Sequence, residues 1–272
     1  MLGRAIWLKD KRTFIIASTG DRASGLTKLM ISLTPFFEAG WNAVIVAQKY
    51  DKAQLSDAVA AGGKGVIVRT FDELLGAHSA KIIALNSVNS DIWCSLDDDM
   101  FATSKTNYDR MAEILLNEKK IGFLSGNWAK TYKQASEKKL SDELVKQKLV
   151  YTGGGLMFRD DVAQIVRSIP NRPYLFDDCL WSMYAYINGY DNYRYRGNVS
   201  VHQICTKGGR RTWISQTKAE NRILPPEKLL RVRKSKDIEG YYICSDKDLT
   251  ELANRLHDEN NDSFLQQKNR VC

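Results

Sequence analysis

Three consecutive carboxylates, Asp97, Asp98 and Asp99, directly follow the mostly apolar run of residues 91–96 (DIWCSL). Adjacent carboxylates on a short turn repel one another, and a hard divalent cation such as Mn²⁺ or Mg²⁺ would neutralise them, with phosphate oxygens as further ligands. A solvated acidic turn that caps the next helix is the alternative. The preceding apolar run favours a metal site, because parallel α/β sheets bind ligands at the carboxyl ends of their strands.

Spacing argues against two other motifs that bind calcium or phosphate. An EF-hand loop would need a ligand two positions beyond Asp99 and then a glycine, but Phe101 and Ala102 stand there. A P-loop ends in Gly-Lys-Ser/Thr, whereas the glycine-containing segment 20–25 is followed by LTK. The sequence therefore indicates neither a calcium loop nor a P-loop NTPase.

The elements that must position the three carboxylates alternate regularly. We predict strands at residues 13–18, 42–47, 65–68 and 91–96, separated by helices at 26–38, 52–61 and 71–87. This alternation predicts an α/β fold with parallel strands and helices on both faces of the sheet. Farther along, the pattern predicts helices at 107–117, 133–148, 161–168, from 177 to Gly189 and near 248–257, and strands at 121–125, 149–152, 156–158 and 193–202.

The net charge of +8 comes from one segment. Residues 206–236 hold ten basic and two acidic side chains, and ten minus two equals the whole excess. Five scattered cysteines without a CxxC pair argue against a disulfide framework and a structural zinc site. No run of eighteen apolar residues is present, and the short N-terminal apolar stretch predicts no secretion signal. We therefore expect a cytoplasmic protein (the host cytoplasm if viral) without a transmembrane segment.

Ordered motifs over residues 13–202 resemble the GT-A glycosyltransferases, which use nucleotide-sugar donors. The motifs are TGDR at 19–22, LGAHSAK at 75–81, IWCSLDDD at 92–99, FDDCLW at 176–181, GY at 189–190 and VH at 201–202. The resemblance implies a GT-A-type, Rossmann-like, mostly parallel sheet flanked by helices in residues 1–205. Its donor half would be residues 1–100 and its acceptor half residues 101–205. A basic C-terminal extension, residues 206–272, would pack on the same domain.

The resemblance also implies roles for individual residues on the donor side. Lys81 matches a position where the family often has an arginine facing the diphosphate, although Ile82 replaces the usual asparagine after it. A histidine beyond the acceptor helix is a metal ligand in many relatives; His202 matches it, although a hydrogen-bonded histidine is the alternative. The remaining implied donor contacts are Thr19 and Arg22 in the nucleotide pocket, Gln48 and Asp51 near the base, Asp97 and Asp98 toward the ribose and donor, and Asp97 and Asp99 as metal ligands.

On the acceptor side, inverting transfer to a hydroxyl needs a general base. The resemblance points to Asp178 as that base and to Asp177 as a neighbour that orients the acceptor, although both carboxylates could simply favour a helix N-terminus. Two glycines, through close approach of their backbone, and two tryptophan side chains are further candidates for contact with the acceptor or the sugar, with unusual turns and core packing as the alternatives; they are Gly154, Gly155, Trp128 and Trp181.

The basic segment bears on the acceptor. Lys207, Arg210 and Arg211 could bind the donor diphosphate or the phosphates of nucleic acid. A solvated surface, or a patch for anionic lipid, is the alternative. An anchor-free chain with localised positive charge is similar to the phage enzymes that glycosylate hydroxymethylated DNA bases. We therefore expect transfer of a hexose or pentose, from UDP-sugar foremost, with DNA as a possible partner. The alternatives are a cytoplasmic glycosyltransferase acting on a glycan, lipid or protein, and a non-catalytic nucleic-acid-binding protein.

Overall fold

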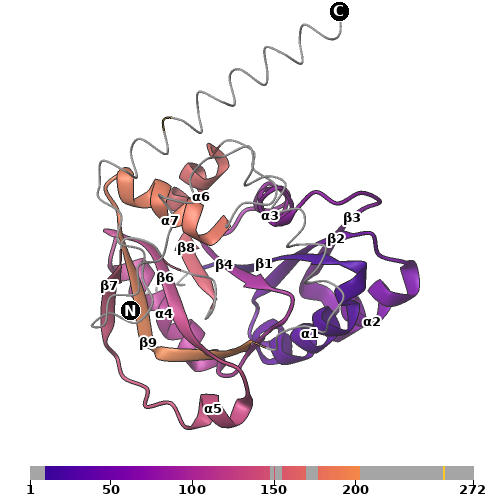
Figure 1. Ribbon diagram of the computed structural model, residues 1–272, viewed down its shortest axis with the longest axis horizontal. Coiled ribbons are helices and arrows are strands. Elements are labelled where there is room, and N and C mark those ends of the chain that lie inside the picture. The colour runs from indigo at the N-terminus through magenta and orange to yellow at the C-terminus, as the bar shows by residue number, and fades with distance from the viewer. Residues whose placement is uncertain (1–9, 148–149, 151–154, 170–176, 203–253, 255–272) are drawn as a thin grey trace, which may run out of the picture.

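The computed structural model describes residues 10–147, 150, 155–169, 177–202 and 254. Within them, helices cover both faces of one central sheet (Figure 1). Several sequence predictions lie outside the described residues: most of the strand at 149–152, most of the helix near 248–257, the extension 206–272 apart from residue 254, and the candidate residues Gly154, Lys207, Arg210 and Arg211. Among the described helices, none has both the length and the apolar character needed to cross a membrane.

The first four predicted strands form the parallel part of the sheet, as expected. They are β1 (Arg12–Thr19), β2 (Asn42–Gln48), β3 (Val66–Phe71) and β4 (Ile92–Asp97), in the order β3-β2-β1-β4. Alternate residues of β1 serve the two faces of the sheet, with Phe14 and Ile16 in one core cluster and Ile15 in the other. This burial on both faces explains why the strand is an apolar run rather than an alternating one.

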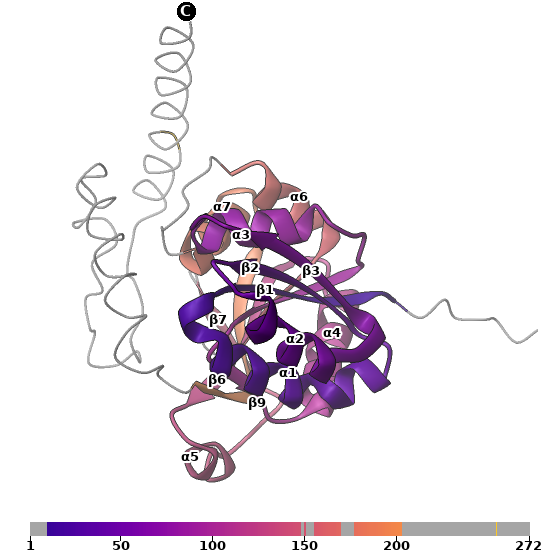
Figure 2. The same ribbon diagram turned by 90° about the vertical axis from the view of Figure 1, so that its right-hand side faces the viewer.

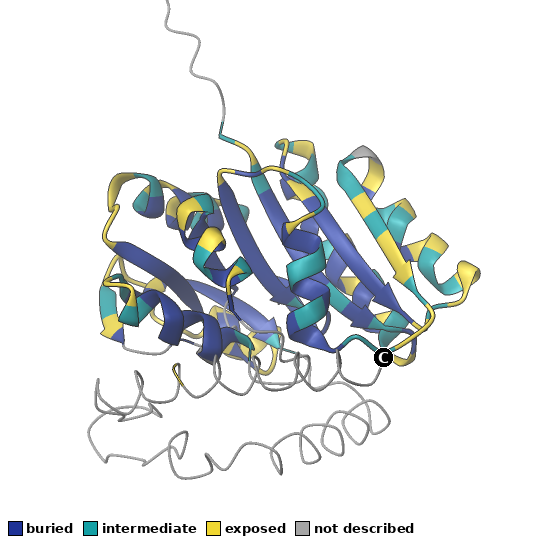
Figure 3. Cartoon of the chain, turned by 90° about the horizontal axis from the view of Figure 1, so that it is seen from above, coloured by how far each residue is buried: buried dark blue, intermediate teal, exposed yellow. Residues whose placement is uncertain are grey.

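Two layers of helices close the sheet. Helices α1 (Ala23–Glu38), α2 (Lys52–Gly62) and α4 (Lys105–Asn117) lie on one face, and α3 (Ala77–Leu85), α6 (Asp160–Arg167) and α7 (Asp177–Ile187) lie on the other (Figure 2). Among the parallel strands, β1, β2 and β4 are buried along most of their length, whereas the edge strand β3 is half-buried or exposed (Figure 3). Two short 3-10 turns, Gly20–Arg22 and Gly63–Gly65, precede α1 and β3.

Beyond β4 the sheet continues with mixed pairing through β8 (Leu156–Arg159), β6 (Ile121–Ala129), β9 (Asp191–His202) and β5 (Met100–Ala102). Strand β8 is antiparallel to both β4 and β6, whereas β6 and β9 are parallel. The short strand β5 pairs Met100 with His202. This pairing brings the end of β9 to the residue that follows Asp97–Asp99.

Two predicted helices are wrong in extent. The helix predicted over 71–87 is only α3, because residues up to Phe71 extend β3 and Gly76, with φ 79°, precedes the first helical turn. The charged stretch 133–148 forms the short helix α5 (Tyr132–Ser136) and then the strand β7 (Leu144–Gln147), which pairs antiparallel with β9. A strand partner distant in sequence therefore overrides the local helical pattern.

Candidate functional site

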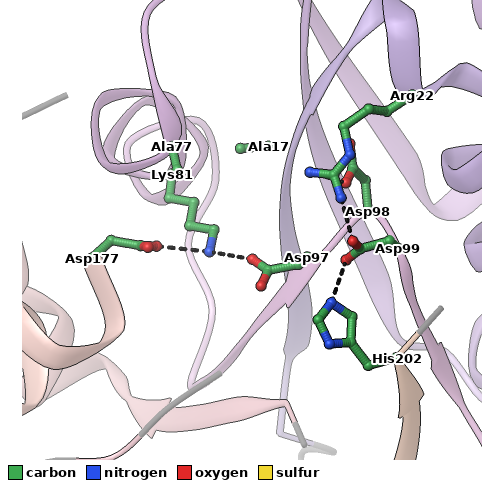
Figure 4. Close-up of a pocket in the computed structure, with 9 residues that line it drawn as sticks. All are labelled: Ala17, Arg22, Ala77, Lys81, Asp97, Asp98, Asp99, Asp177 and His202. Atoms are coloured by element: carbon green, nitrogen blue, oxygen red, sulfur yellow. Dashed lines mark hydrogen bonds and ion pairs between the residues drawn. The ribbon is translucent and has the colours of Figure 1, made fainter. Parts of the chain in front are cut away.

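The three carboxylates lie where the sequence predicts them, at the carboxyl end of β4. Asp97 is the last residue of β4 and is in register with Ala17 of β1, so the two strands end side by side. The described residues around this end line a cavity of about 190 Å³. They are Ala17, Arg22, Ala77, Lys81, Asp97, Asp98, Asp99, Asp177 and His202 (Figure 4).

Arg22 holds two of the three carboxylates. Its Nη1 lies 2.8 Å from Oδ1 of Asp98, and its Nη2 donates to Oδ2 of Asp99. The side chains of Asp98 and Asp99 are 1% and 9% exposed. Such buried carboxylates need a charged or hydrogen-bonding partner, because desolvation strongly penalises an unpaired charge. The guanidinium fork of Arg22 provides that partner for both.

Asp98 belongs to a buried hydrogen-bond network that the sequence analysis missed. Ser18 Oγ donates to Asp98 Oδ2 at 2.5 Å and lies 2.6 Å from the hydroxyl of Tyr50. Burial, with Asp99 and Asp97 adding to it, raises the pKa of Asp98 to about 7 against the opposing effect of Arg22. The signal that could have indicated Ser18 was a polar residue directly after the apolar run of β1, at the strand end that faces the cavity.

The Lys81 side chain lines the cavity on the side opposite Arg22 and is 1% exposed (Figure 4). Its Nζ lies 3.1 Å from Asp97 Oδ1 and 2.7 Å from Asp177 Oδ2, and it sits 5.9 Å from the centre of the Trp181 ring. Burial alone would lower the pKa of Lys81, but Asp177 and Asp97 outweigh that effect and raise it. Lys81 therefore remains an ammonium that ties β4 to the first residue of α7.

The third predicted metal ligand, His202, reaches the same cavity from β9. Its Nε2 lies 3.2 Å from Asp99 Oδ1, and the proximity of Asp99 raises the pKa of the imidazole. No described residue donates a well-aligned hydrogen bond to this buried Asp99 oxygen. Carboxylate oxygen and imidazole nitrogen are both ligands for Mn²⁺. Asp99 and His202 are therefore suitable ligands for a Mn²⁺ ion.

The full predicted metal set is not assembled. Asp97 Oδ1 is directed at Lys81, and the described residues contain no group of three His, Cys, Asp or Glu side chains placed to hold a metal ion. Burial opposes ionisation of Asp97, but Lys81, Arg22 and His202 outweigh it and lower its pKa. Asp97 is thus ionised, and its side chain is 40% exposed beside the cavity.

Three predicted donor contacts are not among the described residues that line the cavity. Gln48 is buried, and its Oε1 accepts hydrogen bonds from the backbone N–H groups of Leu75 and Gly76. Asp51 caps α2 by accepting from the backbone of residue 54, and Thr19 donates its hydroxyl to Asp21. Each of these side chains has a hydrogen-bond partner within the protein.

The predicted acceptor residues separate into cavity, core and surface positions. Asp177 lines the cavity, whereas the neighbouring Asp178 is buried and is not among the described lining residues. Trp181 is a core residue: it is 0% exposed, and its Nε1 donates to His78 Nδ1 at 2.9 Å, so its ring cannot stack on a sugar in this conformation. Trp128 is 44% exposed and meets His202 edge to face, with 5.9 Å between ring centres.

Gly155 serves packing. It has φ 81°, and a β-carbon there would lie 2.9 Å from the hydroxyl of Tyr108. The structure thus accounts for this glycine through a turn and a close approach, which was the alternative interpretation in the sequence analysis.

Solved structures of GT-A glycosyltransferases share this fold. Residues 1–349 of S. aureus TarS align with a TM-score of 0.55 and 13% identity over 84% of this chain and 77% of that chain. The same TarS fragment in complex with UDP-GlcNAc gives a TM-score of 0.58 and 15% identity over 84% and 69%. The mannosyltransferase PcManGT from Pyrobaculum calidifontis, in complex with GDP-Man and Mn²⁺, gives 0.60 and 14% over 82% and 68%.

These likenesses establish the fold: a mostly parallel α/β sheet flanked by helices, of the GT-A type. No protein-family model matches the sequence. No curated protein matches it either.

Proposed function

We propose that this chain is a metal-dependent glycosyltransferase that moves a hexose or pentose from a nucleotide-diphospho-sugar to an acceptor hydroxyl. The charge of the cavity carries the proposal. Its described lining contains four carboxylates but only two permanent cations, Arg22 and Lys81. Even with Asp98 protonated, three carboxylates face these two cations when His202 is neutral, as a metal-binding imidazole must be, so a diphosphate entering this cavity would be repelled unless a divalent cation accompanied it.

Asp99 and His202 would hold the Mn²⁺ or Mg²⁺, with Asp97 near the ribose or as a further ligand once the donor is present. The cation would neutralise charge on the leaving diphosphate. Arg22 lies beside Asp99 and can provide hydrogen bonds to phosphate oxygens. The likeness to a fold solved with UDP-GlcNAc and with GDP-Man and Mn²⁺ supports this class of donor, and we favour a UDP-sugar.

For inverting transfer, the base that takes the acceptor proton would come from the start of α7. We retain Asp178 as the proposed base and Asp177 as its neighbour that orients the acceptor. The competing assignment is Asp177 itself, because it lines the cavity, although its carboxylate is held by Lys81. Asp178→Asn and Asp177→Asn distinguish the two: the base variant should lose transfer while retaining metal-dependent donor binding, measured by calorimetry.

The test of the function is thermal unfolding of the full chain with a panel of UDP- and GDP-sugars, each with and without Mn²⁺. A donor at one hundred times its Kd should stabilise the protein by about 2.7 kcal/mol, and only when Mn²⁺ is present. Asp99→Asn should abolish the effect. Asp109→Asn is the matched control, since Asp109 pairs with Arg12 outside the cavity lining. Stabilisation by no donor, or an Asp99→Asn variant that responds like wild type, would overturn the proposal.

The acceptor we propose is a hydroxymethylated base in DNA, and the support is the excess of ten basic over two acidic residues in 206–236, with Lys207, Arg210 and Arg211 at its start. Such density favours phosphate contacts that weaken as salt rises. A gel-shift titration on duplex DNA at low and high salt tests the binding. Absence of a shift at both salt concentrations would exclude DNA as the acceptor. Product analysis with glycan, lipid and protein acceptors then covers the alternatives. A non-catalytic nucleic-acid-binding protein would show DNA binding without metal-dependent binding of any nucleotide sugar.

A further inference from the structure

Arg22 occupies one side of the acidic turn as an internal counter-ion. It bridges Asp98 and Asp99, and His202 approaches Asp99 through the other carboxylate oxygen (Figure 4). The guanidinium and a cation held by Asp99 would therefore share one carboxylate. Two positive groups on one carboxylate repel each other unless negative charge is placed between them.

We infer that Arg22 makes metal binding conditional on a nucleoside diphosphate. Without nucleotide, Arg22 pairs with both Asp98 and Asp99, offsets part of their negative charge and so weakens the site for a divalent cation. With nucleotide, the diphosphate supplies the negative charge that Arg22 and the cation both need. This inference rests on the proposed function and assigns to Arg22 the coupling between its two ligands.

The surroundings of Arg22 allow it to change partners. Its side chain is 16% exposed on the cavity wall, at the end of the 3-10 turn Gly20–Arg22. If the guanidinium moves to the donor, Asp98 still accepts the hydrogen bond from Ser18, so this buried carboxylate keeps a hydrogen-bond partner. Lys81, at 1% exposure and paired with two carboxylates from different elements, lacks this freedom. Of the two permanent cations in the described lining of the cavity, Arg22 is therefore the one whose side chain can exchange a carboxylate for a phosphate of the donor.

Thermodynamic linkage makes the inference measurable. If the diphosphate tightens Mn²⁺ binding by some factor, Mn²⁺ tightens diphosphate binding by the same factor. Isothermal titration calorimetry of the full chain gives both, using Mn²⁺ alone, UDP or GDP alone, and each nucleotide with Mn²⁺. Arg22→Met removes the internal counter-ion, and Arg22→Gln is a second variant that keeps polar contacts with the turn.

In the absence of nucleotide, Arg22→Met and Arg22→Gln should bind Mn²⁺ roughly tenfold more tightly than wild type, a typical size for coupling between sites. The factor by which UDP or GDP tightens Mn²⁺ binding should fall by a similar amount. Arg12→Met is the matched control, because Arg12 is 14% exposed, pairs with Asp10 and Asp109, and begins β1, whereas Arg22 follows its end. This control should leave every affinity unchanged.

The two possible failures are distinct. If the wild-type chain binds no Mn²⁺ even with UDP or GDP, the proposed function fails and the inference fails with it. If wild type binds both ligands but the Arg22 variants bind Mn²⁺ alone no more tightly than wild type does, only the inference is overturned. Circular dichroism of each variant verifies folding, and the two substitutions give independent measurements of the same coupling.

Discussion

Replacing Lys81 with methionine tests whether the buried ammonium joins the two sides of the cavity. Methionine keeps much of the volume but leaves Asp97 and Asp177 without their shared cation. These carboxylates are 40% and 13% exposed, so water can solvate Asp97 far better than Asp177. Removing one partner of a buried ion pair costs about 3–5 kcal/mol. Because one of the two carboxylates regains water, we expect the lower end, about 3 kcal/mol.

Urea denaturation at pH 7 without metal measures this loss, which is large beside a typical stability of about 5–15 kcal/mol. Adding Asp177→Asn to Lys81→Met should recover at least about 1 kcal/mol, because the buried charge that lost its partner is gone. Lys146→Met is the control: Lys146 pairs with Asp191 but is 59% exposed, so the unfolding midpoint should not move. The reasoning is refuted if Lys81→Met unfolds within about 1 kcal/mol of wild type, or if the double variant is no more stable than the single one.

Three further predictions concern residues that are not among the described residues lining the cavity. Burial lowers the pKa of His78 from 6.5 to about 4 against the opposing effect of Asp177. Between pH 6.5 and 4 the unfolded chain therefore binds a proton at His78 that the folded chain does not. Wild-type stability should therefore fall by up to about 3 kcal/mol from pH 6.5 to 4, and His78→Gln should flatten this part of the profile in urea titrations; an unchanged slope contradicts it. Gly155→Ala should cost about 1–3 kcal/mol in thermal unfolding, from its positive φ and the contact with Tyr108, whereas equal stability would exclude both causes. Trp128→Ala should leave unfolding nearly unchanged, since the ring is 44% exposed, yet reduce transfer about tenfold without altering donor hydrolysis; equal losses in both reactions would exclude an acceptor contact.

In the parallel part of the fold, β1, β2 and β4 could be predicted because each is buried on both faces, unlike the edge strand β3. A continuous apolar run then marks β1, β2 and β4 without knowledge of their neighbours. Strand β7 lacks such a run, since its LVKQ sequence is mostly half-buried or exposed and its pairing partner β9 lies about fifty residues away. Local pattern therefore favoured a helix over 133–148 where tertiary pairing produces a strand.

In the candidate site, the residues at strand ends could likewise be predicted from the sequence, whereas the pairing of a residue on a helix face could not. Asp97–Asp99 could be placed because carboxyl ends of parallel strands converge at one edge of a sheet. Lys81, in contrast, pairs with Asp177 as well as with Asp97. Asp177 lies 96 positions farther along the chain, and no local pattern links it to Lys81. A signal was nevertheless present: the buried residues of α3 are Ala77, His78, Ala80, Lys81, Ala84 and Leu85, the spacing of one apolar face. Lysine on such a face is almost never buried unless paired. The position of Lys81 on this face therefore requires an acidic partner inside the molecule. A lysine with no partner other than the donor diphosphate would be buried and unpaired before the donor binds, so the pairing with Asp97 and Asp177 is the more favourable role for Lys81.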